Sequence, residues 1–284
     1  LMVFTNTGKV YPLNVYEVPE AGRTARGRPI INLVPVNPDE RIAAVVSVRS
    51  EDLEEEGSDL VFVSRLGLVK RTPLTAYKNI RGGGLIATGV AEGDSLVVVN
   101  RLEADTDVDV MIFTLGGQCI RFPKAGSKGA PVFGRTARGN KGIALSDGDV
   151  VVDMLLIPAG EEDAAVDEIE VEEPEDGEDI VLEEEPEITL LTITTLGYGK
   201  RTPLDEYPIQ GRNGKGVISH KTGGDVGDVV RARPVGPDAQ LMLVTDTGRV
   251  IRIPASSVRL VKSRGSKGVR LMRLDEGERI VDVA

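Results

Sequence analysis

Short apolar runs of strand length alternate with turns rich in Gly, Pro and charge along the whole chain. The same order recurs five times: an apolar run enters a glycine turn, a basic second run ends at proline, an Arg/Gly/Lys loop follows, and an acidic turn leads into more aliphatic residues. The turn glycines, spaced by 59, 50, 80 and 51 residues, are Gly8, Gly67, Gly117, Gly197 and Gly248. A recurring unit of about 50 residues with several short strands is typical of propeller-like arrays. The pattern therefore predicts an all-β fold of repeated small sheets.

The limits of the repeats follow from these turns. We expect one domain whose units cover residues 1–49, 60–101, 109–157, 189–236 and 240–284. In each unit the second basic run ends at a proline, which lacks an amide donor and is confined to the end or the edge of a ladder. These residues are Pro12, Pro73, Pro123, Pro203 and Pro254. The acidic residues 50–57 are interpreted as a linker between the first two units.

Residues 161–188 interrupt the period between the third and fourth units. They contain sixteen Asp and Glu and no Lys or Arg. Their length matches the excess of the 80-residue spacing, which predicts an insertion between complete units. So acidic and poorly apolar a segment is expected to be disordered. Two interpretations stay open: a solvated linker, or a tethered polyanion that competes for the basic surface of the domain.

The charge balance divides the chain into a basic domain and this acidic tract. The formal net charge is −11, from 34 Lys and Arg against 45 Asp and Glu. Without residues 161–188 the balance becomes 34 basic against 29 acidic residues, a net charge of +5. A positive surface of this kind favours polyanionic partners.

Composition limits the core and the compartment. There is no Trp, and there are only five Phe and five Tyr, so Val, Ile and Leu are expected to supply the core. The single cysteine, Cys119, excludes an internal disulfide and is expected to be a buried packing residue. No apolar run reaches the roughly 18–20 residues needed to span a bilayer. No signal peptide is visible and the chain opens inside a strand-like run, so we expect a piece of a longer cytoplasmic protein without a membrane partner.

Each unit carries a cationic Gly loop about twenty residues after its turn glycine. Glycine lets the backbone approach a phosphate closely, and Arg or Lys neutralises it without reading a base. Five loops in register predict sequence-independent binding of a polyanion, and duplex is favoured over single strands because few aromatic residues are available for stacking. With the basic second runs included, the predicted DNA-binding residues are Arg23, Arg26, Arg28, Lys70, Arg71, Lys78, Arg81, Arg121, Arg135, Arg138, Lys141, Lys200, Arg201, Arg212, Lys215, Arg249, Arg252, Lys262, Arg264 and Lys267.

Other chemistry is weakly represented. His220 has no recurring nucleophile or carboxylate near it, so a surface position is expected. The acidic turns lack the D-x-D-x-D-G series of a calcium loop, and residues 81–84 lack the Lys-Ser/Thr of a nucleotide loop. With one His and one Cys there are too few ligands for zinc. We therefore expect no catalytic residue, no metal site and no cofactor in this domain.

Longer motifs identify a family. Residues 25–33 read ARGRPIINL and are followed by DERI at 39–42; residues 199–202 read GKRT and continue through EYP at 206–208 to KGVIS at 215–219. In this order they closely resemble the C-terminal domain of the A subunit of bacterial DNA gyrase. The resemblance covers the whole chain apart from the acidic insertion.

That resemblance implies a β-pinwheel, a propeller-like disc of four-stranded blades that exchange strands and wrap duplex DNA around a basic rim. The family has six blades, and five repeats are visible here. It further implies a role in ATP-dependent negative supercoiling within an A2B2 complex formed with the rest of the A subunit, and with the B subunit, in the nucleoid-containing cytoplasm. The catalytic Tyr, ATP and Mg belong to other regions of that type IIA topoisomerase.

Two alternatives stay open. The family's first blade carries the box Q-R-R-G-G-K-G, and residues 210–216 match it at five of seven positions but lie in the fourth repeat. The chain is expected to begin at the second blade, so box function is assigned to no residue. A topoisomerase IV C-terminal domain, which often has fewer blades and lacks the box, is one alternative. A propeller that scaffolds acidic proteins is the other.

Overall fold

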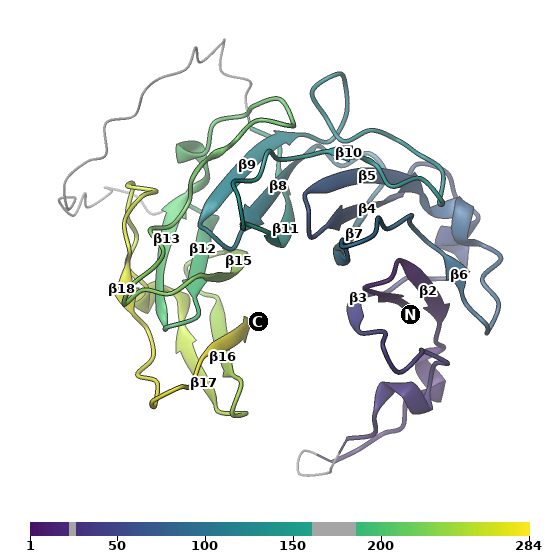
Figure 1. The fold of residues 1–284 in the computed structure, drawn as a ribbon, viewed down its shortest axis with the longest axis horizontal. Coiled ribbons are helices and arrows are strands. Elements are labelled where there is room, and N and C mark those ends of the chain that lie inside the picture. The colour runs from purple at the N-terminus through teal and green to yellow at the C-terminus, as the bar shows by residue number, and fades with distance from the viewer. Residues whose placement is uncertain (23–26, 161–185) are drawn as a thin grey trace. The chain divides into compact units, whose positions relative to one another are not determined.

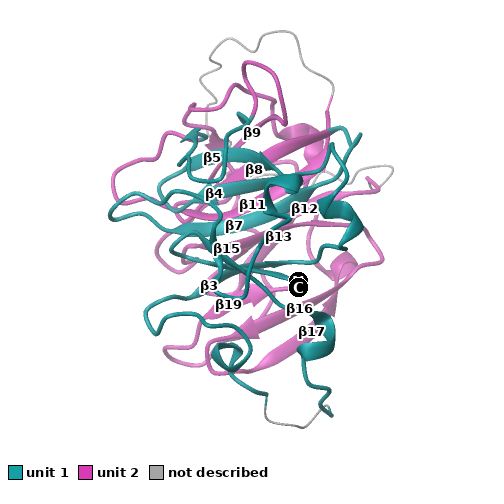
Figure 2. Cartoon of the chain, turned by 90° about the vertical axis from the view of Figure 1, so that its right-hand side faces the viewer, with its two compact units in different colours: residues 1–107, 130–142 teal, residues 108–129, 143–284 magenta. Residues whose placement is uncertain are grey.

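The computed structural model describes residues 1–22, 27–160 and 186–284, which form two compact units. Unit 1 comprises Leu1–Asp107 and Ala130–Gly142, and unit 2 comprises Val108–Gly129 and Ile143–Ala284. Figure 1 labels their strands, and Figure 2 colours the two units separately. Most of the predicted insertion at 161–188, including the expectation of disorder, lies outside the described residues.

Unit 1 contains two four-stranded antiparallel sheets, in the orders β3-β1-β2-β6 and β10-β5-β4-β7. Their strands are β1 (Met2–Thr5), β2 (Lys9–Pro12), β3 (Ile42–Val46), β4 (Asp59–Ser64), β5 (Leu68–Pro73), β6 (Leu85–Ile86), β7 (Leu96–Leu102) and β10 (Asn140–Lys141). Short 3-10 helices connect them: η1 (Val15–Glu17), η2 (Ile30–Asn32), η3 (Glu51–Leu53) and η4 (Leu74–Tyr77).

Unit 2 contains three sheets, in the orders β11-β8-β9-β14, β15-β12-β13-β18 and β17-β16-β19. Their strands are β8 (Val108–Thr114), β9 (Gln118–Pro123), β11 (Val151–Pro158), β12 (Thr189–Thr194), β13 (Tyr198–Pro203), β14 (Val217–Ile218), β15 (Val229–Val235), β16 (Gln240–Thr245), β17 (Val250–Pro254), β18 (Val269–Arg270) and β19 (Ile280–Val283). The 3-10 helices are η5 (Leu204–Glu206) and η6 (Ala255–Ser257).

The sheets follow one plan. A hairpin forms the centre, a later strand of the same repeat pairs with its first strand, and a two-residue strand from the next repeat pairs with its second strand. The two-residue strands that are exchanged in this way are β6, β10, β14 and β18. This topology confirms the all-β class and the predicted exchange of strands between repeats. The expectation of four strands per sheet is wrong for the last sheet, because no strand among the described residues pairs with the outer edge of β17.

Glycine and proline positions in the sequence determine where these strands begin and end. The predicted turn glycines separate the two strands of each hairpin and have positive φ values between 81° and 85°. The second strand of each hairpin ends at the predicted proline. A missing amide at this point ends the ladder, and the chain turns away into a 3-10 helix or a loop.

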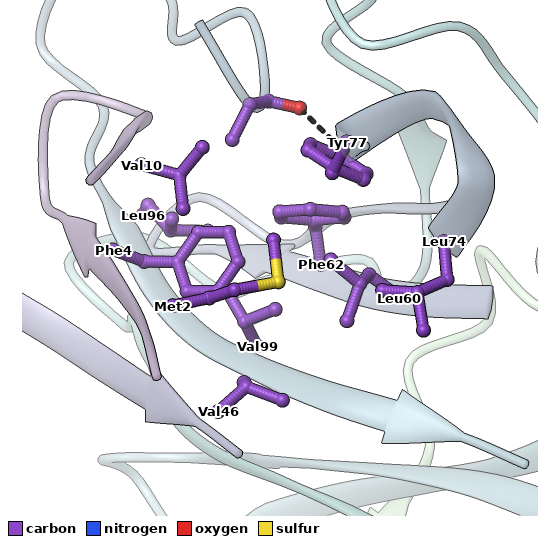
Figure 3. Close-up of a cluster of buried hydrophobic side chains, with 11 residues drawn as sticks. Met2, Phe4, Val10, Val46, Leu60, Phe62, Leu74, Tyr77, Leu96 and Val99 are labelled. Atoms are coloured by element: carbon purple, nitrogen blue, oxygen red, sulfur yellow. Dashed lines mark hydrogen bonds between the residues drawn. The ribbon is translucent and has the colours of Figure 1, made fainter. Parts of the chain in front are cut away.

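Each unit has its own apolar cores. In unit 1 one core joins Met2, Phe4 and Phe62 to Tyr77, with the two Phe rings edge to face at 5.8 Å (Figure 3). The Tyr77 hydroxyl donates to the Ala87 carbonyl at 2.9 Å. The sequence-based expectation of a purely aliphatic core is therefore too narrow. Four of the five Phe side chains are buried, because one aromatic ring contributes more contact than any aliphatic residue.

Helices in the described ranges are 3-10 segments of three or four residues, none of which is long enough to cross a bilayer. The described residues also contain no group of three His, Cys, Asp or Glu side chains that could hold a metal ion.

Candidate nucleic-acid interface

In unit 1 the basic loop of residues 133–139 is fixed at both ends to β5. At its start, Arg71 makes two backbone hydrogen bonds of 2.8 Å with the incoming segment. At its exit, β10 pairs antiparallel with the first residues of β5. The intervening residues must leave the strand direction, and they carry Arg135 and Arg138.

Unit 2 repeats this arrangement twice. The loop of residues 210–216 begins where Gln210 N–H donates to the Arg121 carbonyl at 2.8 Å, and it ends as β14 pairs with β9. The loop of residues 262–268 begins at two 2.9 Å backbone bonds with Arg201 and ends as β18 pairs with β13. The exchange of a short strand therefore places each basic loop beside the hairpin of the preceding repeat.

Glycine is required where these loops return to the strand. Gly139 has a φ of +95°, and a Cβ there would lie 2.5 Å from the Val69 carbonyl oxygen. Gly268 has a φ of +68°, and a Cβ there would collide with the Gly199 carbonyl. Both the backbone conformation and the close approach exclude larger residues.

In β5, β9 and β13 the arginine two residues before the proline donates to a carbonyl of the segment that leads into the loop, whereas Arg252 at the same place in β17 is exposed. Arg71 pairs with Asp59 at 2.9 Å, and Arg121 pairs with Asp109 at 2.8 Å. Arg201 donates from Nε to the Val258 carbonyl at 2.9 Å. A buried guanidinium needs such partners because its desolvation is costly.

Lys70 and Lys200 are fully buried, at 0 % exposure. Lys70 Nζ donates to the carbonyls of Gly134 (3.1 Å) and Arg135 (2.7 Å), which belong to the basic loop, and also to Ala87 O at 3.2 Å. The same ammonium lies 5.0 Å from the centre of the Phe62 ring.

Lys200 repeats these contacts in unit 2. Its Nζ donates to the carbonyls of Ser263 (2.8 Å) and Arg264 and to Ser266 Oγ at 3.3 Å. Burial, with a smaller contribution from the Arg135 guanidinium, lowers the pKa of Lys70 to about 8. Burial, with a smaller contribution from the Arg264 guanidinium, lowers the pKa of Lys200 to about 7. Both lysines therefore titrate much closer to neutral pH than an exposed lysine does.

The predicted DNA-binding residues divide by exposure. Exposed ones are Arg28, Lys78, Arg81, Arg138, Lys141, Lys215, Arg252, Lys262 and Lys267. Half-buried ones are Arg71, Arg135, Arg212, Arg249 and Arg264. Buried ones are Lys70, Arg121, Lys200 and Arg201. Arg23 and Arg26 lie outside the described residues.

The burial of these four cations corrects the prediction that they contact phosphate. Their charged groups are enclosed by carbonyls and carboxylates of the protein, so a polymer in solvent cannot reach them. Arg249 is half-buried but is paired with Glu278 at 2.8 Å and with Asp275 at 3.4 Å. For the exposed and other half-buried residues, contact with DNA stays a prediction.

Sequence reasoning missed three exposed cations beside the loops. The Lys128 carbonyl accepts from Arg212 N–H at 3.1 Å, and Lys221 N–H donates to the Ser266 carbonyl at 3.3 Å. Arg270, on the exchanged strand β18, lies over the Tyr198 ring at 5.1 Å. Lys128 stands in a Ser-Lys-Gly sequence like that of Lys267, a signal that could have found it.

His220 is buried, which corrects the expected surface position. Its Nε2–H donates to the Lys267 carbonyl at 3.1 Å, and its Nδ1 accepts from the Thr192 hydroxyl at 2.8 Å. Burial, with Lys200 nearby, lowers its pKa to about 3, so the ring is neutral. Cys119 is buried as expected, and burial raises the pKa of its thiol to about 12. Neither residue is placed for nucleophilic or acid-base chemistry.

Repeated small sheets with exchanged strands and basic return loops define a class of propeller-like repeat domains. The family model described as DNA gyrase C-terminal domain, beta-propeller, matches residues 1–49, 58–102, 109–158, 189–235 and 239–284. The chain therefore belongs to the family of DNA gyrase C-terminal domains.

Similar sequences agree with this family. The A subunit of DNA gyrase from Salmonella typhimurium is 37 % identical over 281 residues, which cover 99 % of this chain and 28 % of that protein. The same subunit from Mycolicibacterium smegmatis is 35 % identical over 284 residues, covering 100 % of this chain and 30 % of that protein. The chain thus spans less than a third of the length of these relatives.

Solved structures share the fold. The crystal structure of the C-terminal domain of DNA topoisomerase IV matches with a TM-score of 0.77 and 23 % identity, covering 100 % of this chain and 77 % of that one. The structure of a DNA gyrase A C-terminal domain matches with a TM-score of 0.75 and 22 % identity, covering 99 % and 80 %.

Proposed function

We propose that this chain binds duplex DNA without sequence preference, through phosphate contacts made by its exposed basic loops. One observation carries the proposal: three loops occupy the same place in the repeat, each between an anchored start and an exchanged strand, and each exposes a cation, at Arg138, Lys215 and Lys267. Cations on short Gly-containing loops contact phosphates without reading bases.

The family extends the proposal to wrapping. As part of a gyrase A subunit in an A2B2 enzyme of the bacterial cytoplasm, the domain would wind duplex DNA and support ATP-dependent negative supercoiling. Bending duplex costs several kcal/mol, so contacts on successive repeats must offset that cost. Short duplexes that reach only one or two repeats should therefore bind disproportionately weakly.

Salt dependence and loop substitutions test the binding. If the nine exposed predicted cations all contact phosphates, log K should fall with log salt at a slope of roughly −8. Arg138→Gln, Lys215→Gln and Lys267→Gln should each weaken binding about three- to tenfold for any duplex sequence. Arg279→Gln is the matched control, because Arg279 is exposed but lies in the acidic turn before β19.

Two outcomes would favour the alternatives. Loop variants that bind duplex like the wild-type chain, or a flat salt dependence, would point to a scaffold for acidic proteins. Salt-steep binding without approach of the DNA ends, measured by energy transfer between labelled ends, would point to the topoisomerase IV-like alternative, which binds DNA without strong wrapping.

A further inference from the structure

Lys70 and Lys200 hold the basic loops by a contact that is unusual for a lysine. Each ammonium is fully buried, and among the described residues neither makes a salt bridge to a carboxylate. A buried cation without a counterion is costly unless dipoles surround it. Here the carbonyls of two consecutive loop residues supply those dipoles, Gly134 and Arg135 for Lys70.

The two sites are copies of one another. Lys70 lies opposite Phe62 in the β4–β5 pair, and Lys200 lies opposite Thr192 in the β12–β13 pair. The loop carbonyls that they bind stand at the same distance from the return glycine of their loops: Arg135 is four residues before Gly139, and Arg264 is four residues before Gly268. A coincidental contact on one loop would not recur at the same atoms of the other.

This contact also sets the direction of the loop amides. In a planar peptide the N–H points away from the C=O. The carbonyls of residues 134 and 135 face Lys70, so the N–H groups of Arg135 and Thr136 are directed away from the lysine. Arg264 and Gly265 are turned in the same way by Lys200. None of these four amides donates a hydrogen bond within the described ranges, so no carbonyl of those ranges competes with an anion for them.

The remaining loop of unit 2 lacks this device. Ile120 of β9 stands where β5 and β13 have lysine, and a Cβ at Gly214 would lie 3.5 Å from its Cδ1. Apolar packing therefore lies against the 210–216 loop, and none of the hydrogen bonds between described residues joins a lysine ammonium to its carbonyls. The chain provides its own comparison between loops with and without a lysine.

We propose that Lys70 and Lys200 are positioning residues that fix the loops at 134–138 and 263–267 so that their outward amides and cations meet DNA phosphates. The proposal rests on the proposed function, because it concerns how the same loops engage DNA. The lysines themselves touch no DNA. They act through Arg138 in unit 1 and through Lys267 in unit 2.

A double-mutant cycle on the 284-residue chain tests this role, with fluorescence titration of a labelled duplex as the readout. Lys200→Met keeps the length of the side chain and removes its charge, and it should weaken binding about fivefold under conditions where the protein stays folded. Lys267→Gln should then have little further effect in the Lys200→Met background. The cross pair of Lys200→Met with Arg138→Gln should stay additive, and Lys70→Met should couple to Arg138 instead.

Amide hydrogen exchange separates this proposal from the proposed function. Lys200→Met should speed exchange at the two hydrogen-bonded amides that hold this loop, Val261 and Lys221, and leave the Ala137 amide of the other loop unchanged, whether or not DNA binds. If the wild-type chain fails to bind duplex while this local change occurs, the proposed DNA binding is wrong, but Lys200 still fixes the conformation of the loop. Unchanged exchange at Val261 and Lys221, or full additivity of Lys200→Met with Lys267→Gln, would overturn the positioning role. If Lys200→Met unfolds the protein, Ser266→Ala removes one acceptor of the same ammonium and takes its place in the cycle.

Discussion

Lys70 in unit 1 and Lys200 in unit 2 occupy the same position of the repeat but face different neighbours. Lys70 lies against the Phe62 ring, at the edge of an aromatic core. Lys200 lies opposite Thr192, which is hydrogen-bonded to His220, and that ring binds the carbonyl of Lys267 in the loop. The same loop geometry is therefore supported by apolar packing in one unit and by a polar network in the other.

The difference shows which contact the loop depends on. Opposite the lysine, unit 2 has Thr192 where unit 1 has Phe62. His220 of unit 2 stands where unit 1 has Thr88. The ammonium nevertheless binds two loop carbonyls in both units. The surroundings of the lysine can change as long as its Nζ reaches the loop. At the third loop, Ile120 takes the place of the lysine, and the contact found among the described residues is apolar packing.

The largest loss of stability should come from removing the Phe62 ring that lies against Lys70. Phe62→Ala removes a buried ring from the core of unit 1 and should lower the free energy of unfolding by about 3–5 kcal/mol. Thr192→Ala leaves His220 Nδ1 without its donor and should cost about 1–2 kcal/mol. Urea denaturation of both variants measures the difference. Similar costs would mean that the ring contributes little beyond its contact with the lysine.

The pH dependence of stability should distinguish the two lysines. Each folded pKa lies below the 10.5 of an unperturbed lysine, so the unfolded chain binds a proton that the folded chain has lost. The contribution of each lysine to stability should therefore rise with pH up to about 10.5, starting at about pH 7 for Lys200 and at about pH 8 for Lys70, by up to about 1.4 kcal/mol per pH unit.

Denaturation series between about pH 6 and pH 10 check this order. Lys200→Met should remove the rise that begins at about pH 7, and Lys70→Met should remove the later one. A wild-type rise that survives in both variants would show that other groups cause it.

The smallest effect is expected at the loop without a lysine. Ile120→Val removes one methylene beside Gly214 and should cost about 0.5–1.5 kcal/mol at every pH. Amide exchange at residues 211–215 should increase slightly and should show no dependence on the charge of a lysine. If the loss of unfolding free energy in Ile120→Val depended on pH, this loop would not differ from the two loops that are bound by a lysine.

The repeat could be predicted from the sequence because each residue that marks it acts only on the backbone at its own position. A glycine with positive φ and a proline without an amide constrain only their own residues, so Gly67 and Pro73 mark a hairpin in any context. The all-β class, the hairpins and the positions of the basic loops could therefore be predicted. Cys119, in an apolar run of strand length, could be placed in the core by the same reasoning.

The burial of the second strands could not be read in this way. The basic second run predicts Lys70 and Arg71 as DNA contacts beside the loop, but their side chains point to opposite faces of the strand, and only the folded chain shows what covers the face of Lys70. The exchanged segment of the next repeat covers that face and supplies the carbonyls that make a buried ammonium tolerable. Position 220 follows the same logic, since only the folded chain brings Thr192 and the Lys267 carbonyl to the two nitrogens of its ring.

The sequence by itself determined the repeat, the ends of its strands and the existence of cationic loops, since each depends on residues close together in the chain. The tertiary structure alone decided which cations remain in solvent. Lys200 and Lys267 are both basic residues in glycine-containing runs, yet the first is buried under a loop 63 residues away and the second is exposed on it. The free energy of a charge depends on the dipoles and water around it, and contacts between distant residues set those surroundings.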